Sequence, residues 1–216
     1  MTYNEYLVDF IKTFPVAEPI FIEDLKAILL DKFKNENINK MFMNVNVILN
    51  RLVKADILKT FYKGIYYKPK TNIFGEMALN KGKVIKYKYI EDRNGNIKGY
   101  IYGAKLFNIL GLTTQVPNVL NIATNECKTV YNYKNKYLNV IIKKPKIVIT
   151  NDNYLYLQLF DILENKDNIN IEVNNGDEII VKYIQSLNLD YKKIITYAYQ
   201  TNNLKLLEKL AVIIKN

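Results

Sequence analysis

The residues best suited to chemistry lie on one predicted helix, residues 38–55 (INKMFMNVNVILNRLVKA). Lys40, Asn44, Val47 and Arg51 follow one another on its polar side at intervals of three or four residues, about one helical turn. An asparagine amide can pair with adenine in the major groove, and lysine or arginine can bind guanine or phosphate. The spacing therefore indicates a surface that reads duplex DNA. The alternative is a solvated helix face in an asparagine-rich sequence.

A basic hairpin is predicted directly after this helix, in the segment ILKTFYKGIYYKP. Two runs of β-prone residues flank Lys63-Gly64, and glycine supplies the positive φ that a tight turn requires. Lys54 ends the helix, and Lys59, Lys63 and Lys68 lie in the strands and the turn, from which they could reach phosphates. We therefore predict that the helix reads bases and that the hairpin holds the backbone.

Two further amphipathic helices are predicted before this pair, over residues 3–14 and 21–33, from the helical spacing of their apolar residues. Three helices followed by a two-stranded ribbon is the order of a winged helix-turn-helix. In that fold the third helix lies in the major groove and the ribbon touches the backbone beside it. We predict such a DNA-binding domain over residues 1–70.

Several kinds of catalysis are excluded by composition. The sequence has no histidine and a single cysteine, Cys127, which removes histidine-based catalysis, Cys-His pairs and nearly every zinc site. Glu126-Cys127-Lys128 has the E-x-K form of some metal-dependent nucleases, but the upstream Pro-Asp element is absent. Glycine-rich phosphate motifs are absent as well. We therefore expect no catalytic residue, no metal site and no cofactor.

The positive charge is concentrated. The formal net charge is +10, and residues 71–150 hold 13 basic and 4 acidic side chains, against 7 and 9 in residues 151–216. Such an excess favours nucleic acid or a membrane surface as partner, although lysine and asparagine are also abundant in AT-rich genes. No apolar run approaches the ~20 residues that span a bilayer, and no basic flank precedes one at the N-terminus. We expect a cytoplasmic protein with no membrane partner.

The second part of the chain, residues 71–216, is predicted to be an α/β domain that ends in helices, which makes the whole chain α+β. Residues 71–79 are predicted to be a linker. Strands are predicted at 119–124, 128–133 and 137–143. Helices are predicted at 80–92, 104–110 (with Gly111 as its C-cap), 154–164, 177–187, 190–200 and 203–214.

Two stretches resemble a known family: GIYYKP at 64–69 and the longer GYIYGAKLFNILGLTTQVPN at 99–118. They are similar to the AbiEi-type antitoxins of type IV toxin–antitoxin systems. The residues of the second motif that carry the resemblance are Gly99, Tyr100, Gly103, Leu110, Gly111, Leu112, Thr113, Thr114, Gln115 and Pro117. The resemblance implies a winged helix that represses its own operon at inverted repeats. It also implies a C-terminal domain that counteracts a nucleotidyltransferase-like toxin encoded next door, without the need for a stable complex.

Two other functions stay open. One is a stand-alone winged-helix regulator whose C-terminal domain senses a ligand or a partner, and the identity of the adjacent gene would separate it from an antitoxin. The other is an enzyme that cleaves nucleic acid with carboxylates and a metal. The acids available to it in residues 71–150 are Glu76, Glu91, Asp92 and Glu126.

Overall fold

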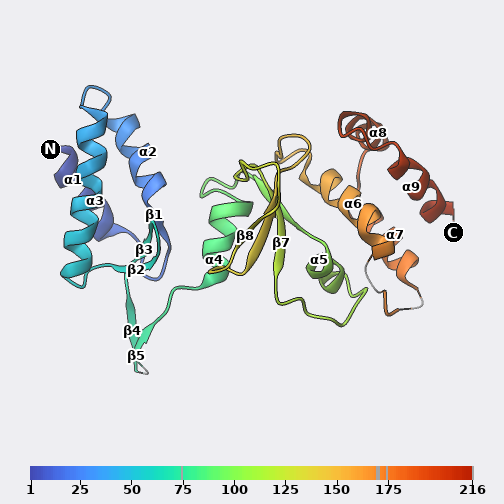
Figure 1. Ribbon diagram of the computed structural model, residues 1–216, viewed down its shortest axis with the longest axis horizontal. Coiled ribbons are helices and arrows are strands. Elements are labelled where there is room, and N and C mark those ends of the chain that lie inside the picture. The colour runs from blue at the N-terminus through green and yellow to red at the C-terminus, as the bar shows by residue number, and fades with distance from the viewer. Residues whose placement is uncertain (74, 169–170, 174, 216) are drawn as a thin grey trace. The chain divides into compact units, whose positions relative to one another are not determined.

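The computed structural model describes residues 1–73, 75–168, 171–173 and 175–215, and it shows a mixed α+β chain (Figure 1). The α+β class predicted from the sequence is confirmed. The chain divides into two compact units, Met1–Val84 and Ile85–Asn216. None of the described helices combines the length and apolar content needed to cross a bilayer.

Unit 1, Met1–Val84, begins with helices that pack on one another and on a small sheet. Its elements are α1 (Tyr3–Thr13), β1 (Ile20–Phe21), α2 (Ile22–Lys32), α3 (Ile38–Lys54), β2 (Lys59–Tyr62), β3 (Ile65–Tyr67), β4 (Lys70–Asn72) and β5 (Gly75–Met77). The helices predicted at 3–14, 21–33 and 38–55 are confirmed to within one residue at each end. Their apolar faces form the core, with Leu7, Leu25, Leu29, Met41, Val45 and Leu49 almost fully buried.

The hairpin predicted around Lys63-Gly64 is confirmed. Strands β2 and β3 pair antiparallel, and β1 adds to the other side of β3 in the order β1-β3-β2. Gly64 has a φ of +75°, a region that favours glycine, and its carbonyl accepts a hydrogen bond from the backbone N–H of Ile22 at 3.0 Å. The turn is therefore joined to the start of α2.

The linker predicted at 71–79 was wrong, because β4 and β5 form a second antiparallel hairpin there. Every residue of both strands is exposed, so the alternation of apolar and polar residues that marks a strand in a sequence is missing. Lys59 lies 3.8 Å from Glu76 of β5, and Lys83 pairs with Glu18. These contacts attach residues 71–84 to unit 1, whereas the sequence placed the domain boundary at residue 70.

Unit 2, Ile85–Asn216, contains a mixed sheet in the order β6-β7-β9-β8. Strands β6 (Gly99–Tyr102) and β7 (Leu120–Thr124) pair antiparallel, β7 and β9 (Val140–Lys143) parallel, and β8 (Tyr133–Asn135) and β9 antiparallel. The predicted strand at 119–124 is confirmed, and the one at 137–143 is confirmed over its second half. The strand predicted at 128–133 was misplaced, since β8 starts only at Tyr133.

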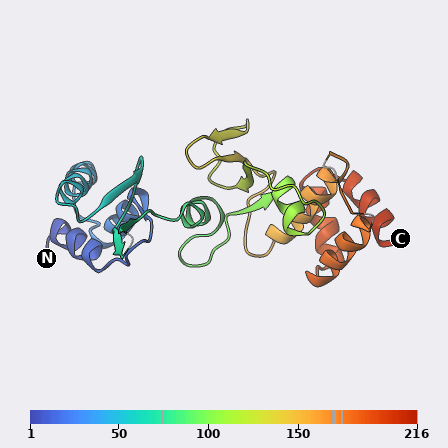
Figure 2. The ribbon, with the colours of Figure 1, turned by 90° about the horizontal axis from the view of Figure 1, so that it is seen from below.

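The helices predicted for this half are confirmed. They are α4 (Lys81–Ile85), continued by a π-helical turn over Lys86–Ile90, then α5 (Ala104–Ile109), α6 (Tyr154–Asn165), α7 (Gly176–Ser186), α8 (Tyr191–Gln200) and α9 (Lys205–Lys215). A 3-10 turn, Lys166–Asn168, follows α6. Helix α6 packs against β6, and α6–α9 gather on one side of the sheet (Figures 1 and 2). Their buried residues form one core with Phe107 and Leu112.

Candidate nucleic-acid interface

Helix α3 carries most of the residues predicted to bind DNA. The Asn37 side chain caps its first turn by accepting a hydrogen bond from the backbone N–H of Lys40 at 3.1 Å. Arg51 and Lys54 lie in its last turn, where positive charge opposes the partial negative charge of the helix end. The buried face consists of Met41, Val45, Ile48, Leu49 and Leu52.

Two neighbouring helices define which part of the polar side of α3 faces outward. The Asn44 amide donates a hydrogen bond of 2.6 Å to the Tyr3 hydroxyl, so α1 lies along that side. Lys26 of α2 lies 4.9 Å from the centre of the Phe42 ring, so α2 lies along the other. The exposed residues between these two edges fall into two groups. Lys40, Val47 and Arg51 lie next to Asn44, and the residues farther from α1, here called the outward face, are Asn39, Met43, Asn46, Asn50 and Lys54.

The arc predicted from the sequence lies nearer to α1 than the outward face does. Asn44, Val47 and Arg51 line a groove of about 530 Å³ between α1 and α3, together with Glu5, Asp9 and Lys12 of α1. A hydrogen bond from the backbone N–H at the N-cap of α1 holds the pKa of Glu5 below its usual value, which keeps this carboxylate negative. The groove therefore mixes acidic with basic side chains, and the Asn44 amide is already bonded to Tyr3. The outward face has no acid among its residues, so it is the better surface for nucleic acid.

The predicted phosphate-binding side chains differ in their freedom. Lys59 donates a 2.9 Å hydrogen bond to Asp56, which raises the pKa of Lys59, and Lys68 donates to the carbonyl of Lys12. Among the side chains predicted to bind DNA, the exposed cationic ones without a hydrogen bond or ion pair in the described part of the chain are Lys40, Arg51, Lys54 and Lys63. Lys63 at the hairpin turn is therefore the lysine of the hairpin most available to a phosphate.

The motif at 99–118 provides structure in unit 2 rather than an open site. Gly99 in β6 pairs with Thr124 of β7, and a Cβ there would meet the carbonyl oxygen of Ala123 at 2.7 Å and that of Tyr89 even closer. The Tyr100 hydroxyl donates a 2.7 Å hydrogen bond to Asp161. Each of these two residues is thus fixed by its neighbours across the sheet or on α6.

Helix α5 starts and stops at the glycines of the same motif. Gly103 precedes it with a φ of +70°, and Gly111 follows its C-cap residue Leu110 with a φ of +74°. The sequence analysis predicted Gly111 as the C-cap, whereas Leu110 is the C-cap and Gly111 lies one residue beyond it. Leu112 next to it is fully buried in the core of unit 2.

The last part of the motif is joined to the segment before α7. Thr114 donates from its backbone N–H and its hydroxyl to Glu172, at 2.7 and 2.6 Å, and these bonds hold the pKa of Glu172 below its usual value. The buried hydroxyl of Thr113 accepts a hydrogen bond from the backbone N–H of Gln115 at 3.2 Å. Gln115 is exposed and Pro117 half-buried, which leaves a turn whose tip points to solvent.

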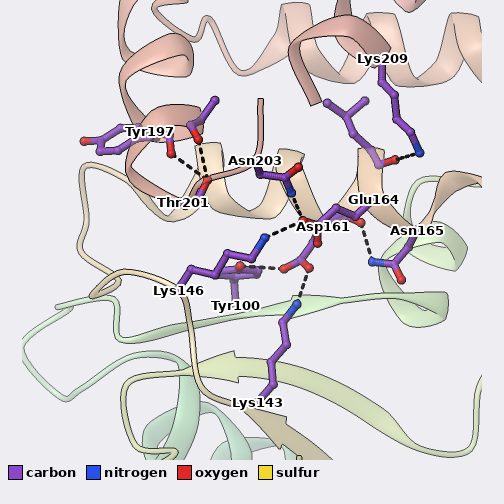
Figure 3. A network of polar contacts seen from close by, with 12 residues as sticks. Tyr100, Lys143, Lys146, Asp161, Glu164, Asn165, Tyr197, Thr201, Asn203 and Lys209 are labelled. Carbon is purple, nitrogen blue, oxygen red and sulfur yellow. Dashed lines mark hydrogen bonds and ion pairs between the residues drawn. The ribbon is translucent and has the colours of Figure 1, made fainter. Parts of the chain in front are cut away.

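A buried acid at the centre of unit 2 was not predicted from the sequence. Asp161 of α6 is only 3% exposed, and Figure 3 shows it between Tyr100 of β6 and Lys143 of β9. Burial raises the pKa of Asp161, while the ammonium group of Lys143 and the Tyr100 hydroxyl act against that rise. Lys143 also lies 3.9 Å from the centre of the Tyr102 ring. The cluster joins sheet and helix.

Glu126, in the E-x-K stretch, accepts a hydrogen bond from Lys98 at 3.1 Å, while Cys127 is buried and Lys128 is exposed. Across the described part of the chain, no three acidic or cysteine side chains gather as a metal ion would require.

Sequence reasoning named the arc of α3 next to α1 and missed Asn39, Asn46 and Asn50 as the centre of the exposed face. The sequence does place these three residues on the polar side of the helix. Which residues of that side are best placed to bind DNA depends on where α1 and α2 pack. Nothing in the sequence marked Asp161 or Glu172 as a residue with structural partners, because an acid in a helix or a loop is normally solvated.

Unit 1 and unit 2 make up a mixed α+β protein. Helix α3 of unit 1 has an exposed surface rich in asparagine and lysine, and a buried ion pair joins the sheet of unit 2 to α6. The chain belongs to DUF6088, a family of unknown function, whose family model matches residues 12–190. No curated protein matches the chain.

Proposed function

We propose that the chain is a DNA-binding antitoxin that represses its own operon at inverted repeats, with unit 1 acting as a winged helix-turn-helix. The observation that carries the DNA-binding part is the outward face of α3, which presents Asn39, Asn50 and Lys54 to solvent without an acid among its residues. In this proposal α3 enters the major groove, where asparagine pairs with adenine, and the exposed Lys63 at the β2–β3 turn holds a phosphate.

The order of elements in unit 1 supports this assignment. Helices α1 to α3 are followed by the β2–β3 hairpin, with β1 pairing to β3. Hydrogen bonds and buried apolar residues fix α3 and the hairpin within one unit. A rigid pair of this kind can contact a base edge and a neighbouring phosphate at the same time, as sequence-specific binding requires.

The antitoxin part of the proposal is supported by the resemblance of residues 99–118 to AbiEi-type antitoxins. Its target is a nucleotidyltransferase-like toxin, the product of the adjacent gene, acting in the cytoplasm. The proposal assigns no catalytic step and no cofactor to this chain. An adjacent gene of a different kind, with DNA binding intact, would favour the stand-alone regulator instead.

Two substitutions test the DNA-binding part on the DNA upstream of the gene and on random duplex DNA. Lys63→Ala is expected to weaken both equally and to lower the slope of log K against log salt by about one unit, because it removes one phosphate contact. Asn50→Ala is expected to weaken binding to the upstream DNA by about 1–3 kcal/mol and to leave random DNA unchanged, because it removes a base contact. Fluorescence titrations at several salt concentrations measure both effects.

Asn44→Ala is the matched control, since its amide is already bonded to Tyr3 and borders the groove beside α1. It is expected to leave binding to the upstream DNA within about twofold of the parent chain, a small difference on the scale of a lost base contact. Selective loss with Asn44→Ala but not with Asn50→Ala would mean that the groove side of α3 meets DNA, as predicted from the sequence. If Lys63→Ala and both asparagine variants bind like the parent, the DNA-binding proposal fails.

A further inference from the structure

The most exposed aromatic surface of unit 2 lies around strand β8 and is unused by the proposed function. Tyr131 is 85% exposed, Tyr133 50% and Val130 85%. Tyrosine normally buries most of its ring and exposes only its hydroxyl. Two rings left in solvent within three residues of one another are available to a ligand.

Lysines flank these rings in the sequence. Residues 127–151 contain six lysines and no acid. Lys143 and Lys146 pair with Asp161 and Glu164 of α6. Within the described chain, the others make no ion pair, and all four are exposed: Lys128, Lys134, Lys136 and Lys144. The surface is therefore positive as well as aromatic, and its ligand should be an anion with flat faces.

The segment that carries the rings is held at both ends. Cys127 is buried at its start, with its thiol 3.9 Å from the carbonyl oxygen of Ile142. Asn135 is buried at its other end and accepts a hydrogen bond from the backbone N–H of Leu138 at 3.0 Å. Between them the Thr129 hydroxyl donates to the carbonyl of Tyr131 at 2.8 Å. The backbone of the segment is therefore already ordered before a ligand binds, which lowers the entropy lost on binding.

The position of the segment leaves room for a chain-like ligand. Of the described strands, β8 lies at the edge of its sheet and pairs only with β9. In both views the β8–β9 ribbon lies away from α7, α8 and α9 (Figures 1 and 2). Lysines on an edge strand also prevent sheet-to-sheet aggregation, but that role needs no exposed tyrosine.

We propose that this surface, residues 128–137, binds single-stranded nucleic acid, with Tyr131 and Tyr133 stacking on unpaired bases and Lys128, Lys134 and Lys136 holding phosphates. Unpaired bases offer free faces to aromatic rings, whereas the bases of a duplex already stack on one another. The binding is sequence-tolerant because every base has such a face. It is separate from duplex recognition by α3, which uses the other unit.

The test uses the full-length chain and fluorescein-labelled 15-mers of uridine and of thymidine, with a random duplex as third ligand. The double variant Tyr131→Ala/Tyr133→Ala is expected to weaken binding to the single strands at least about tenfold, because each stacked base contributes measurably. Its duplex binding should stay within twofold of the parent. Tyr131→Phe/Tyr133→Phe should bind like the parent, because the ring is kept. Preference for uridine or for thymidine would identify RNA or DNA as the natural class.

The matched control is Tyr191→Ala/Tyr199→Ala on α8, whose rings are 62% and 65% exposed. It should leave single-strand binding unchanged, and melting curves should show all variants folded. The proposal is overturned if the parent binds neither single strand, or if the Tyr131/Tyr133 variant loses no more affinity than the α8 control. The proposal is also overturned if the Tyr131/Tyr133 variant loses affinity for vesicles of anionic lipid but none for single strands, because the surface would then be assigned to membranes.

Discussion

Replacing Gly99 by alanine should unfold unit 2 and, if the chain acts as the proposed antitoxin, abolish growth rescue from its toxin while binding to the upstream DNA persists. The added Cβ would meet backbone carbonyls on two sides, those of Ala123 and Tyr89. Neither carbonyl can move without breaking the β6–β7 pairing or the turn before β6. The loss of stability should therefore exceed the usual range for overpacking, at more than about 3 kcal/mol. Circular dichroism during heating measures the loss of structure, and co-expression with the adjacent gene measures rescue.

Gly95→Ala is the control for this prediction. Gly95 has a positive φ, +84°, unlike Gly99, and a Cβ there has nothing within 4 Å. The substitution should cost about 1 kcal/mol through backbone strain alone and leave rescue intact. Equal melting curves for the two variants would show that the close approach at Gly99 is not a constraint. Rescue by an unfolded Gly99→Ala chain would contradict the role proposed for unit 2.

Removing Lys143 should destabilise unit 2 by about 3 kcal/mol, because it leaves the buried carboxylate of Asp161 without its cation. Lys146→Ala provides a closely matched comparison. Lys146 pairs with Glu164, three residues after Asp161 on α6, at 2.9 Å, but its side chain is 54% exposed. An exposed pair contributes less than about 1 kcal/mol. Urea unfolding of the two variants, followed by circular dichroism, compares them directly.

The pH dependence of the Lys143→Ala variant distinguishes a lost ion pair from lost packing. Burial already raises the pKa of Asp161 above its ordinary value of 3.8, and loss of the neighbouring ammonium group should raise this pKa further. A carboxyl with a raised folded-state pKa favours folding at low pH, and this contribution is lost as the pH rises through that pKa. The variant should therefore approach the parent in stability at acid pH and fall behind it as the pH rises. A gap that does not change with pH would contradict the ion-pair explanation.

The helices could be predicted closely because local signals define them. In α3 the apolar residues recur at helical spacing, and Asn37 marks the start. The hairpin around Gly64 was equally visible, since a glycine turn separates two β-prone runs. In contrast, β4 and β5 expose every residue, so no burial pattern distinguishes them from a linker. Strand β8 was misplaced because Tyr131 is exposed outside any strand, although its residue type is typical of strands.

The sequence predicted which side of α3 is polar, but not which residues of that side face away from α1. Periodicity separates Asn44 and Asn50 from the buried face equally well. Only the packing of α1, through the hydrogen bond from Asn44 to Tyr3, shows that Asn44 borders the groove beside α1 and that Asn50 faces outward. Asp161 was invisible for a related reason, because its partners Tyr100 and Lys143 come from distant strands.

Cys127 gives the protein a chemical reporter of its own. It is the single cysteine of the sequence and only 3% exposed, beside β9 in unit 2. A thiol reagent can reach it only when this part of the sheet opens, so the rate of labelling reports the opening of unit 2 alone, in the intact chain and without an added probe. The labelling rate thus detects transient openings that are too rare for spectroscopy. Any ligand that binds the β8 surface should slow the labelling.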